Sequence, residues 1–444
     1  MRTKIRALRN LIAERPQHRE ILTNIGWLMF DKILRLLGGV FVAAWVARYL
    51  GPAAYGQYSY VIAFSGLFIN FASLGLNSLI VRDLVWELDS RNEILGTALF
   101  LQIASGICAA LLSMIGADLL DKGADRTMLS YVLILSPIYV LKATETIKYW
   151  FESRVRSVNS VLIEDGVYIL MIAARVFLIK SGAGVAAFIY LTLFEAALTA
   201  VALVLLYSFR IGSMLAWSVN SKRSMRLVKD AWPMLLSSVA IAVYMRIDQV
   251  MLGFMSGESA VGIYTAAVRI SELWYVIPTA IVGSVFPSVL ATRASGDLVS
   301  YRKKVQFLLS SMASISVAIS VLVTIFANTA VTALYGKGYE AAANVLRIHI
   351  WAGVFVFTGT VGARWYVSEG LQRFSMLAAV VGAVINVALN LVLIPSWGAL
   401  GAAIATIISY GIATYLMDFF LDLSRPMFFM KTRALLIFGS KKGI

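Results

Sequence analysis

Residues 22–49 read LTNIGWLMFDKILRLLGGVFVAAWVARY, an apolar stretch with Asp31, Lys32 and Arg35 near its middle. A helix needs about 20 mostly apolar residues to cross the hydrocarbon core of a bilayer. The stretch is longer than that, so it predicts a transmembrane helix. A charge at bilayer depth costs at least ~2.5–3.5 kcal/mol and is normally kept for a cavity, an ion path or a charged partner. The stretch therefore predicts a transporter with a charged interior.

The whole chain repeats this pattern. It is 60% hydrophobic and 14% charged, against about 25% charged residues in an ordinary soluble domain. Barrel strands would alternate over about 10 residues, and that alternation is absent. The sequence predicts an all-α polytopic membrane protein of about 12 transmembrane helices. We expect spans near 22–49, 56–81, 94–116, 129–150, 160–180, 185–209, 231–253, 260–290, 304–326, 343–367, 374–394 and 398–420.

Loop charges predict the orientation of these spans. One set of alternate loops is rich in Lys and Arg, whereas the other holds only Lys122, Arg126, Lys180 and Lys337. Basic loops remain in the cytoplasm, so both termini are expected there. The predicted organisation is a basic segment at 1–21, an N-lobe at 22–209, a basic inter-lobe loop at 210–230, a C-lobe at 231–420 and a basic tail at 421–444.

Two internal repeats relate the halves. Residues 51–58 and 257–264 share the pattern G-x-x-A-x-G-x-Y, and 182–187 and 398–403 share a Gly-rich start to a span. Because six spans separate the copies, the repeats are parallel, and transporters of this kind bind their cargo between the halves. For Gly38, Gly39, Gly398 and Gly401, close helix packing is the simpler interpretation.

Several motifs together carry a resemblance to a known family. The segments are ARYLGPAAYGQY at 47–58, RIDQVMLG at 246–253, LYGKGY at 334–339, and NLVLIP at 390–395 followed by Gly398 and GAA at 401–403. In this order and spacing, the chain resembles the polysaccharide exporter family of the multidrug/oligosaccharidyl-lipid/polysaccharide superfamily, which is MATE-like.

The resemblance implies two six-helix bundles around a V-shaped central cavity. It implies flipping of undecaprenyl-pyrophosphate-linked oligosaccharide from the cytoplasmic to the outer leaflet of a bacterial inner membrane. O-antigen units of lipopolysaccharide are the common cargo, and capsule, exopolysaccharide or teichuronic-type units are alternatives. Polymerase and chain-length proteins of the same polysaccharide pathway are the implied protein partners.

Basic residues within the spans are the candidates for binding the cargo headgroup. Arginine can hold phosphate oxygens through two parallel hydrogen bonds. The candidates are Arg35, Lys32, Lys142, Arg175, Arg246 and Arg269. Arg35, Arg246 and Arg269 are preferred, since the first and seventh spans are equivalent in the repeat. The alternative for each is an internal ion pair that fixes helix packing.

Carboxylates within the spans are candidates for coupling transport to a proton or to sodium. They are Asp31, Glu195, Asp248 and Glu272. Arg269 and Glu272 are three residues apart on one helix and can neutralise each other. Glu195 has no charged residue within four positions. A hydrogen bond that pairs two helices is the alternative role for each carboxylate.

Other classes of function are less consistent with the sequence. We expect no cleavable signal peptide, because no short apolar region with a cleavage site follows the basic N-terminus. Cys108, His18 and His349 form no disulfide or metal pattern, so we expect no metal site, cofactor or catalytic residue. The net charge of +15 is explained by cytoplasmic loops, not by nucleic acid. Two alternatives remain open: a multidrug cation antiporter, whose cavity would be acidic, and a glycan polymerase or ligase, which would need a large outer loop.

Overall fold

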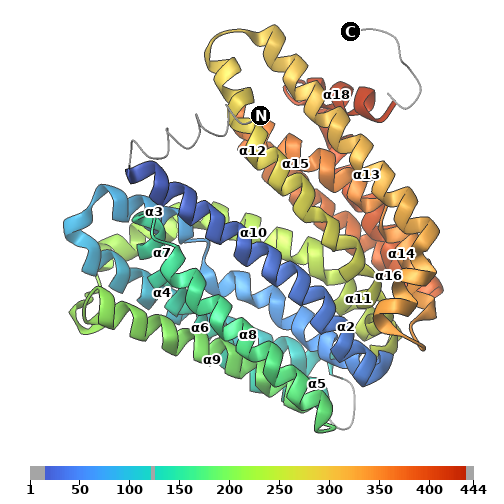
Figure 1. Ribbon diagram of the computed structural model, residues 1–444, viewed down its shortest axis with the longest axis horizontal. Helices are drawn as coiled ribbons and strands as arrows, with labels where there is room; N and C mark the ends of the chain where they lie inside the picture. Colours follow the sequence, from blue (N-terminus) through green and yellow to red (C-terminus); the bar gives the residue numbers. More distant parts are fainter. Residues whose placement is uncertain (1–15, 122–125, 437–444) are drawn as a thin grey trace. The chain divides into compact units, whose positions relative to one another are not determined.

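The computed structural model describes residues 16–121 and 126–436, and within 16–37 it describes only some of the side chains. Throughout these ranges the secondary structure is helical. The chain forms two compact units (Figure 1). Unit 1 holds the chain up to Ala43 and Ser65–Val239, and unit 2 holds Ala44–Phe64 and the chain from Ala240 onward. The protein is an all-helical membrane protein.

Unit 1 is built from helices that run up and down between short turns. Its elements are parts of α2 (Pro16–Ser73) and α10 (Ser221–Ser256), with α3 (Asn77–Trp86), η1 (Leu88–Ser90), α4 (Arg91–Leu120), α5 (Thr127–Leu135), α6 (Pro137–Leu141), η2 (Lys142–Glu145), α7 (Thr146–Ser153), α8 (Val158–Lys180), α9 (Val185–Arg210) and η3 (Met214–Ala216). Its largest buried cluster joins α3, α4, α7 and α9 around Leu84, Ile94, Trp150 and Leu203.

Unit 2 takes the middle of α2 and the end of α10. Its further elements are α11 (Glu258–Glu272), η4 (Leu273–Tyr275), α12 (Val276–Ala294), α13 (Leu298–Tyr335), α14 (Glu340–His349), α15 (Ala352–Ser368), α16 (Gln372–Gly411), the π-helical turn η5 (Ile412–Leu416), α17 (Met417–Phe420) and α18 (Arg425–Leu436). Its core joins α12, α13, α15 and α18 around Phe286, Met312, Phe357 and Met427.

The two copies of the G-x-x-A-x-G-x-Y repeat pack directly against each other within unit 2. Gly51 and Gly257 both have positive φ, 75° and 83°, a backbone conformation that glycine adopts readily. A Cβ on Gly56 would lie 1.7 Å from the carbonyl oxygen of Glu258, and one on Gly262 would lie 2.0 Å from that of Pro52. The second glycine of each copy therefore lets two helices touch, as small residues do in membranes.

Nine helical segments of the described residues are long and apolar enough to cross a membrane. Two of them, Gly38–Trp86 and Gln372–Phe420, have 49 residues each and contain the backbone breaks at Gly51, Gly75 and Gly398. Helix α8 is not among the nine, and Glu164, Asp165 and Arg175 interrupt its apolar sequence. These nine segments do not settle the predicted count of about 12 spans in two six-helix bundles, which remains a prediction.

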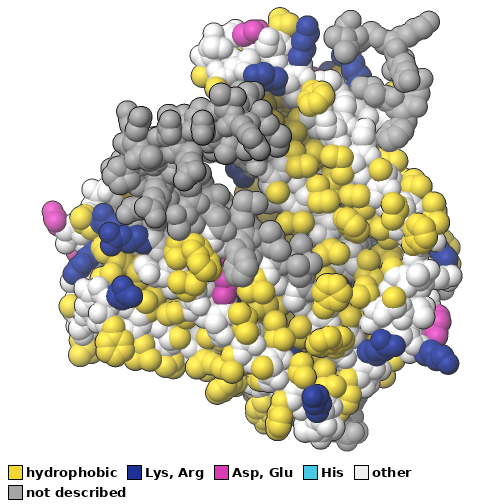
Figure 2. All heavy atoms as spheres, viewed as in Figure 1, with side chains coloured by type: hydrophobic (Ala, Val, Ile, Leu, Met, Phe, Trp, Pro, Cys, Tyr) yellow, Lys and Arg dark blue, Asp and Glu magenta, His cyan; other side chains and the backbone are white. Residues whose placement is uncertain are grey.

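Unit 2 presents an apolar face to its surroundings. Figure 2 shows a largely hydrophobic surface over α13, with Lys and Arg side chains toward its ends. Phe307, Leu322 and Ile325 on this helix are 74%, 57% and 66% exposed. Such a contiguous apolar surface would be unfavourable in water, whereas the acyl chains of a bilayer would cover it.

Two segments expected to be loop or tail are in fact partly helical. Residues 221–230 of the predicted inter-lobe loop form the first turns of α10, and α18 lies within the predicted tail. The basic side chains of 221–230 suggested a loop, but all four of them lie on the helix. Arg223 and Arg226 bind carboxylates of unit 1 there. The predicted lobe boundaries themselves stay predictions.

Candidate functional site

Arg35 of α2 lies at the centre of a charged cluster in unit 1. Its Nε donates to Asp31 one turn earlier, as the predicted shared helix face requires. Its Nη2 lies 3.7 Å from Glu164 Oε2 and 3.6 Å from Asp165 Oδ1, both on α8. This Nη2 is buried and makes no hydrogen bond within the described part of the chain. Arg35 is therefore held by carboxylates while one of its amino groups retains donor capacity. The side chain of Lys32 falls outside the described residues.

The cluster continues from α8 to η2 through Lys148. Its Nζ lies 2.7 Å from Glu164 Oε1 and 3.3 Å from Glu145 Oε1. Glu145 also accepts a hydrogen bond of 2.8 Å from Lys142. Lys142, Glu145 and Lys148, at three-residue intervals, thus pair within one helical stretch. Among the described side chains of the cluster, four carboxylates lie beside three cations, so these cations are held by protein groups.

Glu195, which has no charged neighbour in sequence, has a partner in the structure. Arg175 on α8 donates to it across to α9, with 2.6 Å between Nη2 and Oε2. Lys142, Glu145 and Glu195 also line one cavity of about 300 Å³ between α6, η2 and α9. The fold therefore brings two predicted residues, Lys142 and Glu195, together around a single cavity of unit 1.

Asp248 in unit 2 has a different environment. It is 3% exposed, and its Oδ2 accepts hydrogen bonds of 2.6 Å from the hydroxyls of Tyr264 on α11 and Thr406 on α16. Asn390 Nδ2 donates to its Oδ1, also at 2.6 Å. No Lys, Arg or His of the described ranges lies within ion-pair distance of it. Asp248 is a buried carboxylate satisfied by neutral donors alone.

The oxygens around Asp248 could hold a small hard cation or a proton. Asn390 Oδ1 is buried and has no hydrogen-bond partner among the described residues, and Asn386 supplies a second amide oxygen 3.1 Å from Asn390 Nδ2. An uncompensated buried charge is costly, and carboxylate, amide and hydroxyl oxygens are the ligands that hard cations prefer. No group of three or more His, Cys, Asp or Glu gathers to hold a metal elsewhere in 16–121 and 126–436.

Of the remaining predicted residues of unit 2, Glu272 lies close enough to Asp248 for their charges to interact. Arg246 is two residues away but exposed, so it faces the other way. Glu272 interacts electrostatically with both Arg246 and Arg269. Arg269 lies among tyrosines, interacting electrostatically with Tyr55, Tyr58 and Tyr335. Arg269 and Glu272 therefore influence each other as predicted, while a tyrosine environment surrounds the arginine.

One buried ion pair of unit 2 was not predicted. Lys431 of α18 lies 2.8 Å from Asp418 Oδ2, and both side chains are 1% exposed. Asp418 also accepts from the hydroxyl of Tyr366, and Lys431 donates to the carbonyl of Thr414. Burial lowers the pKa of the Lys431 ammonium, opposed by the attraction of Asp418. Lys431 interrupts an apolar run at 427–439. A lone lysine in such a run was the available signal for a buried partner.

Lys431 also lines a cavity with four tyrosines in unit 2. The cavity measures about 250 Å³ and is bordered by Tyr244, Tyr275, Tyr366 and Tyr410. The Tyr244 and Tyr410 rings are stacked with their centroids 4.3 Å apart. The hydroxyls of Tyr244 and Tyr275 are buried and make no hydrogen bond to a described residue. Such a cavity could bind an apolar or cationic guest by its rings and orient it by its hydroxyls.

Comparison with known protein families gives this geometry a context. The profile of the family described as polysaccharide biosynthesis protein matches residues 21–292, more than half of the chain. The chain belongs to this family. A second profile, of the lipid II flippase MurJ, matches residues 167–439. The family lies within the MATE-like exporter superfamily, and its members are transporters, not enzymes.

Curated relatives of this family member are archaeal. One is "Probable flippase AglR" of Haloferax volcanii, 32% identical over 185 residues, which are 39% of this chain and 37% of the relative. Another from the same organism is named as a probable low-salt glycan biosynthesis flippase, 23% identical over 235 residues, 49% of each chain. The chain thus matches less than half the length of these relatives.

Solved structures of the superfamily share the fold. A MATE family multidrug transporter in an inward-facing conformation superposes with a TM-score of 0.72 at 16% identity, covering 94% of this chain and all of that one. The lipid II flippase MurJ in an inward closed conformation gives 0.71 at 16% identity over 95% and 94% of the two chains. At this identity the similarity establishes the MATE/MurJ fold of a multi-pass membrane protein.

Sequence reasoning found most charged members of these sites but few neutral ones. Asn390 belongs to a recognisable motif, yet its role beside Asp248 was not predicted, and neither were those of Tyr264 and Thr406. The available signal was the pair Asn386 and Asn390, one turn apart in an otherwise apolar span. Polar residues that share a face of such a span form hydrogen bonds between helices.

Proposed function

We propose that this family member flips a lipid-linked oligosaccharide from the cytoplasmic to the outer leaflet of its membrane. The observation that carries the proposal is the family match over residues 21–292. The archaeal relatives named as flippases support a glycan cargo. We infer a pyrophosphate-linked carrier, undecaprenyl pyrophosphate in a bacterium, with O-antigen, capsule or exopolysaccharide repeat units as the glycan.

The charged cluster of unit 1 is the part of the protein that we assign to the headgroup. Arg35 has a buried Nη2 that makes no hydrogen bond within the described ranges, and arginine is suited to phosphate oxygens. Lys142 and Arg175 of unit 1 are further contacts under this proposal, and Lys32, Arg246 and Arg269 remain candidates for binding the headgroup or the glycan. Because Asp31, Glu164 and Asp165 hold Arg35, a phosphate would bind in exchange for a carboxylate.

We assign coupling to Asp248. A buried carboxylate that has only neutral donors attracts a proton or sodium ion. Glu195 is a weaker candidate because Arg175 already neutralises it, and Asp31 and Glu272 are near arginines as well. Binding of the ion to Asp248 would shift the balance between inward-open and outward-open states, and the halves would alternate access to the cargo.

The location follows from the same proposal. We infer a plasma membrane, which is the inner membrane in a bacterial host, with both termini in the cytoplasm as the loop charges predict. Membrane lipids surround the protein, and the polymerase and chain-length proteins of the polysaccharide pathway would receive its product.

Reconstituted transport tests this proposal. The purified protein would be placed in liposomes with a pyrophosphate-linked oligosaccharide carrying a fluorescent sugar, and a membrane-impermeant quencher would report which leaflet holds the label. We expect quenching beyond the half expected for a static bilayer, and less of it in Arg35→Gln. Quenching equal to that of protein-free liposomes would overturn the proposal, whichever ion gradient is imposed.

A multidrug cation antiporter is the second candidate. The fold shared with a multidrug transporter and the tyrosine-lined cavity of unit 2 support it, because aromatic faces attract organic cations. The same liposomes, loaded with a fluorescent organic cation, separate the two candidates. Cation efflux that requires Asp248, without movement of the glycolipid, would favour the antiporter.

A further inference from the structure

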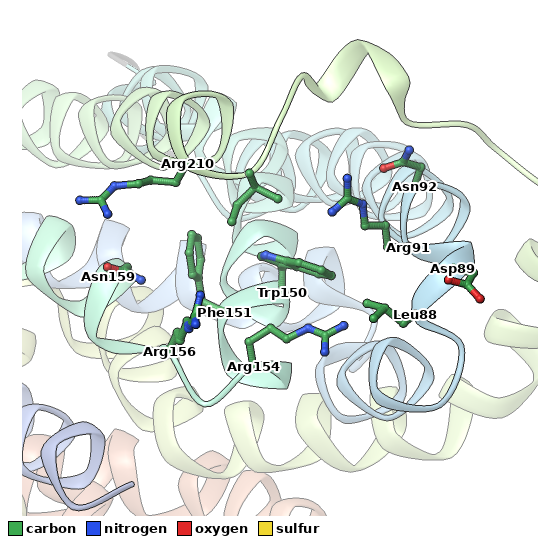
Figure 3. Close-up of a pocket in the computed structure, with 11 residues that line it drawn as sticks. Leu88, Asp89, Arg91, Asn92, Trp150, Phe151, Arg154, Arg156, Asn159 and Arg210 are labelled. Atoms are coloured by element: carbon green, nitrogen blue, oxygen red, sulfur yellow. The ribbon is translucent and has the colours of Figure 1, made fainter. Parts of the chain in front are cut away.

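A pocket lined by four arginines opens in unit 1, apart from the Arg35 cluster. Figure 3 shows it at the point where the ends of five elements meet, namely η1, α4, α7, α8 and α9. The cavity measures about 800 Å³. We call it the arginine pocket; its lining includes Arg91, Arg154, Arg156, Arg210, Asn92 and Asn159. None of these residues belongs to the chain of ion pairs that contains Arg35.

The charge of the arginine pocket is not balanced by protein groups. Asp89 is the one carboxylate in its lining. No ion pair links any of the four arginines to a carboxylate of the described chain, and Nη2 of Arg154 is buried without a hydrogen-bond partner there. An unsatisfied buried charged donor is costly, so the pocket as it stands lacks an acceptor.

Other arginines of unit 1 show what a satisfied arginine looks like in the same fold. Arg82 of α3 donates to Asp83 at 2.8 Å, and Arg226 of α10 donates to the same carboxylate at 2.9 Å. These guanidinium groups join α3 and α10. Their contacts explain them as structural, whereas the arginines of the pocket have no such contacts.

Trp150 orients two of the pocket arginines without occupying their donors. The guanidinium carbons of Arg91 and Arg154 lie 5.5 and 4.9 Å from its ring centroids, which is within cation–π range. The indole is part of the buried core of unit 1, so it is a rigid platform. Figure 3 shows the guanidinium groups around Trp150 and Phe151. Their N–H groups therefore remain available for a ligand.

We propose that the arginine pocket binds a phosphate-bearing ligand. Several guanidinium forks converging on one cavity match phosphate oxygens, which accept two parallel hydrogen bonds from each fork. The side-chain amides of Asn92 and Asn159 can donate to further oxygens. The loops that bear these arginines are on the side predicted to be cytoplasmic, where both an anionic phospholipid headgroup and a soluble polyphosphate could reach them.

Binding of two probes to the full-length protein tests this assignment and separates the two sources. The protein would be held in nanodiscs of phosphatidylcholine. Inorganic pyrophosphate binding would be measured by calorimetry, and retention of added phosphatidylglycerol would be measured by native mass spectrometry. Pyrophosphate binding alone indicates a soluble ligand, and selective retention of phosphatidylglycerol indicates a lipid headgroup. Failure of the native protein to bind either probe would overturn the proposal.

Variants localise the binding. Arg156 and Arg210 are exposed, so Arg156→Gln and Arg210→Gln should fold normally, and each should weaken binding about tenfold, the loss of one charge-assisted hydrogen bond. Arg154→Lys keeps the charge and should bind more weakly than native if the bidentate fork matters. Arg82→Gln removes an arginine that also stacks on a tryptophan but is held by Asp83. Equal losses in Arg82→Gln and the pocket variants would contradict the site.

Discussion

Two buried aspartates of unit 2 are stabilised in opposite ways. Asp418 and Asp248 are 1% and 3% exposed, and each accepts a hydrogen bond from a tyrosine, Tyr366 or Tyr264. Asp418 has the ammonium of Lys431 beside it, whereas Asp248 has Thr406 and Asn390. The first carboxylate is neutralised and fixes α18 to the unit. The second has only neutral donors beside it among the described residues, and for this reason we propose the functional role there.

Breaking the Asp418 pair should give the largest effect on stability. Lys431→Met leaves Asp418 buried without its cation, and removal of one partner of a buried pair costs roughly 3–5 kcal/mol. We expect a marked drop in unfolding temperature of the detergent-solubilised protein. The double variant Asp418→Leu with Lys431→Met should recover most of it, because a well-packed apolar pair can replace an ion pair. No recovery would mean that the pair has a role beyond burial.

Neutralising Asp248 should affect transport and not stability. Asp248→Asn removes the charge but keeps the shape and most hydrogen bonds, so the unfolding temperature should stay equal or rise. Ion-driven transport in liposomes should fall by about a hundredfold if the carboxylate supplies some 3 kcal/mol of coupling, at the upper end of the usual range. If the variant transports normally or is strongly destabilised, Asp248 has a structural role, as Asp418 does.

In unit 1, by contrast, one cation, Arg35, lies among several carboxylates. Arg35→Gln should lower glycolipid flipping about tenfold, the loss of one charge-assisted hydrogen bond, and Arg35→Lys should recover only part of it. Arg82→Gln is the matched control, since it removes an arginine of unit 1 that is already held by Asp83 and has no part in the proposed headgroup site. Similar losses for both variants would show that ion pairing, and not headgroup contact, determines the effect.

An exposed aspartate provides the smallest effect. Asp297 caps α13, accepting a 2.9 Å hydrogen bond from the Ser300 backbone N–H. Hydrogen bonding from the Ser300 hydroxyl and then from this backbone N–H lowers the pKa of its carboxyl. The folded state therefore holds the proton less tightly than the unfolded chain. The contribution of the cap is complete above the ordinary aspartate pKa of about 4 and is lost as pH falls through the lower folded-state pKa. Asp297→Ala should lower the unfolding temperature slightly at pH 7, and Asp297→Asn should lower it less. The difference in unfolding temperature between the native protein and each variant should shrink at acidic pH.

Local spacing in the sequence predicted part of the charge network. Asp31 and Arg35, and Lys142, Glu145 and Lys148, pair within single helical stretches, because residues three and four apart share a helix face. Arg175 and Glu195 are 20 residues apart in the sequence, and their ion pair joins helices α8 and α9. Such a contact depends on how helices pack, which spacing along one helix does not specify.

The sequence by itself determined that this is a helical membrane protein with buried charges, since apolar length and composition decide what a bilayer accepts. It also contained the two copies of the glycine motif, but it did not indicate that the two copies pack against each other. Only the tertiary structure decided which charges are neutralised. It also decided that Lys431 of α18 lies beside Asp418, and that four arginines at or near helix ends line one pocket. The reason is that the energy of a buried charge depends on the groups around it in space, and those groups come from helices far apart in the chain.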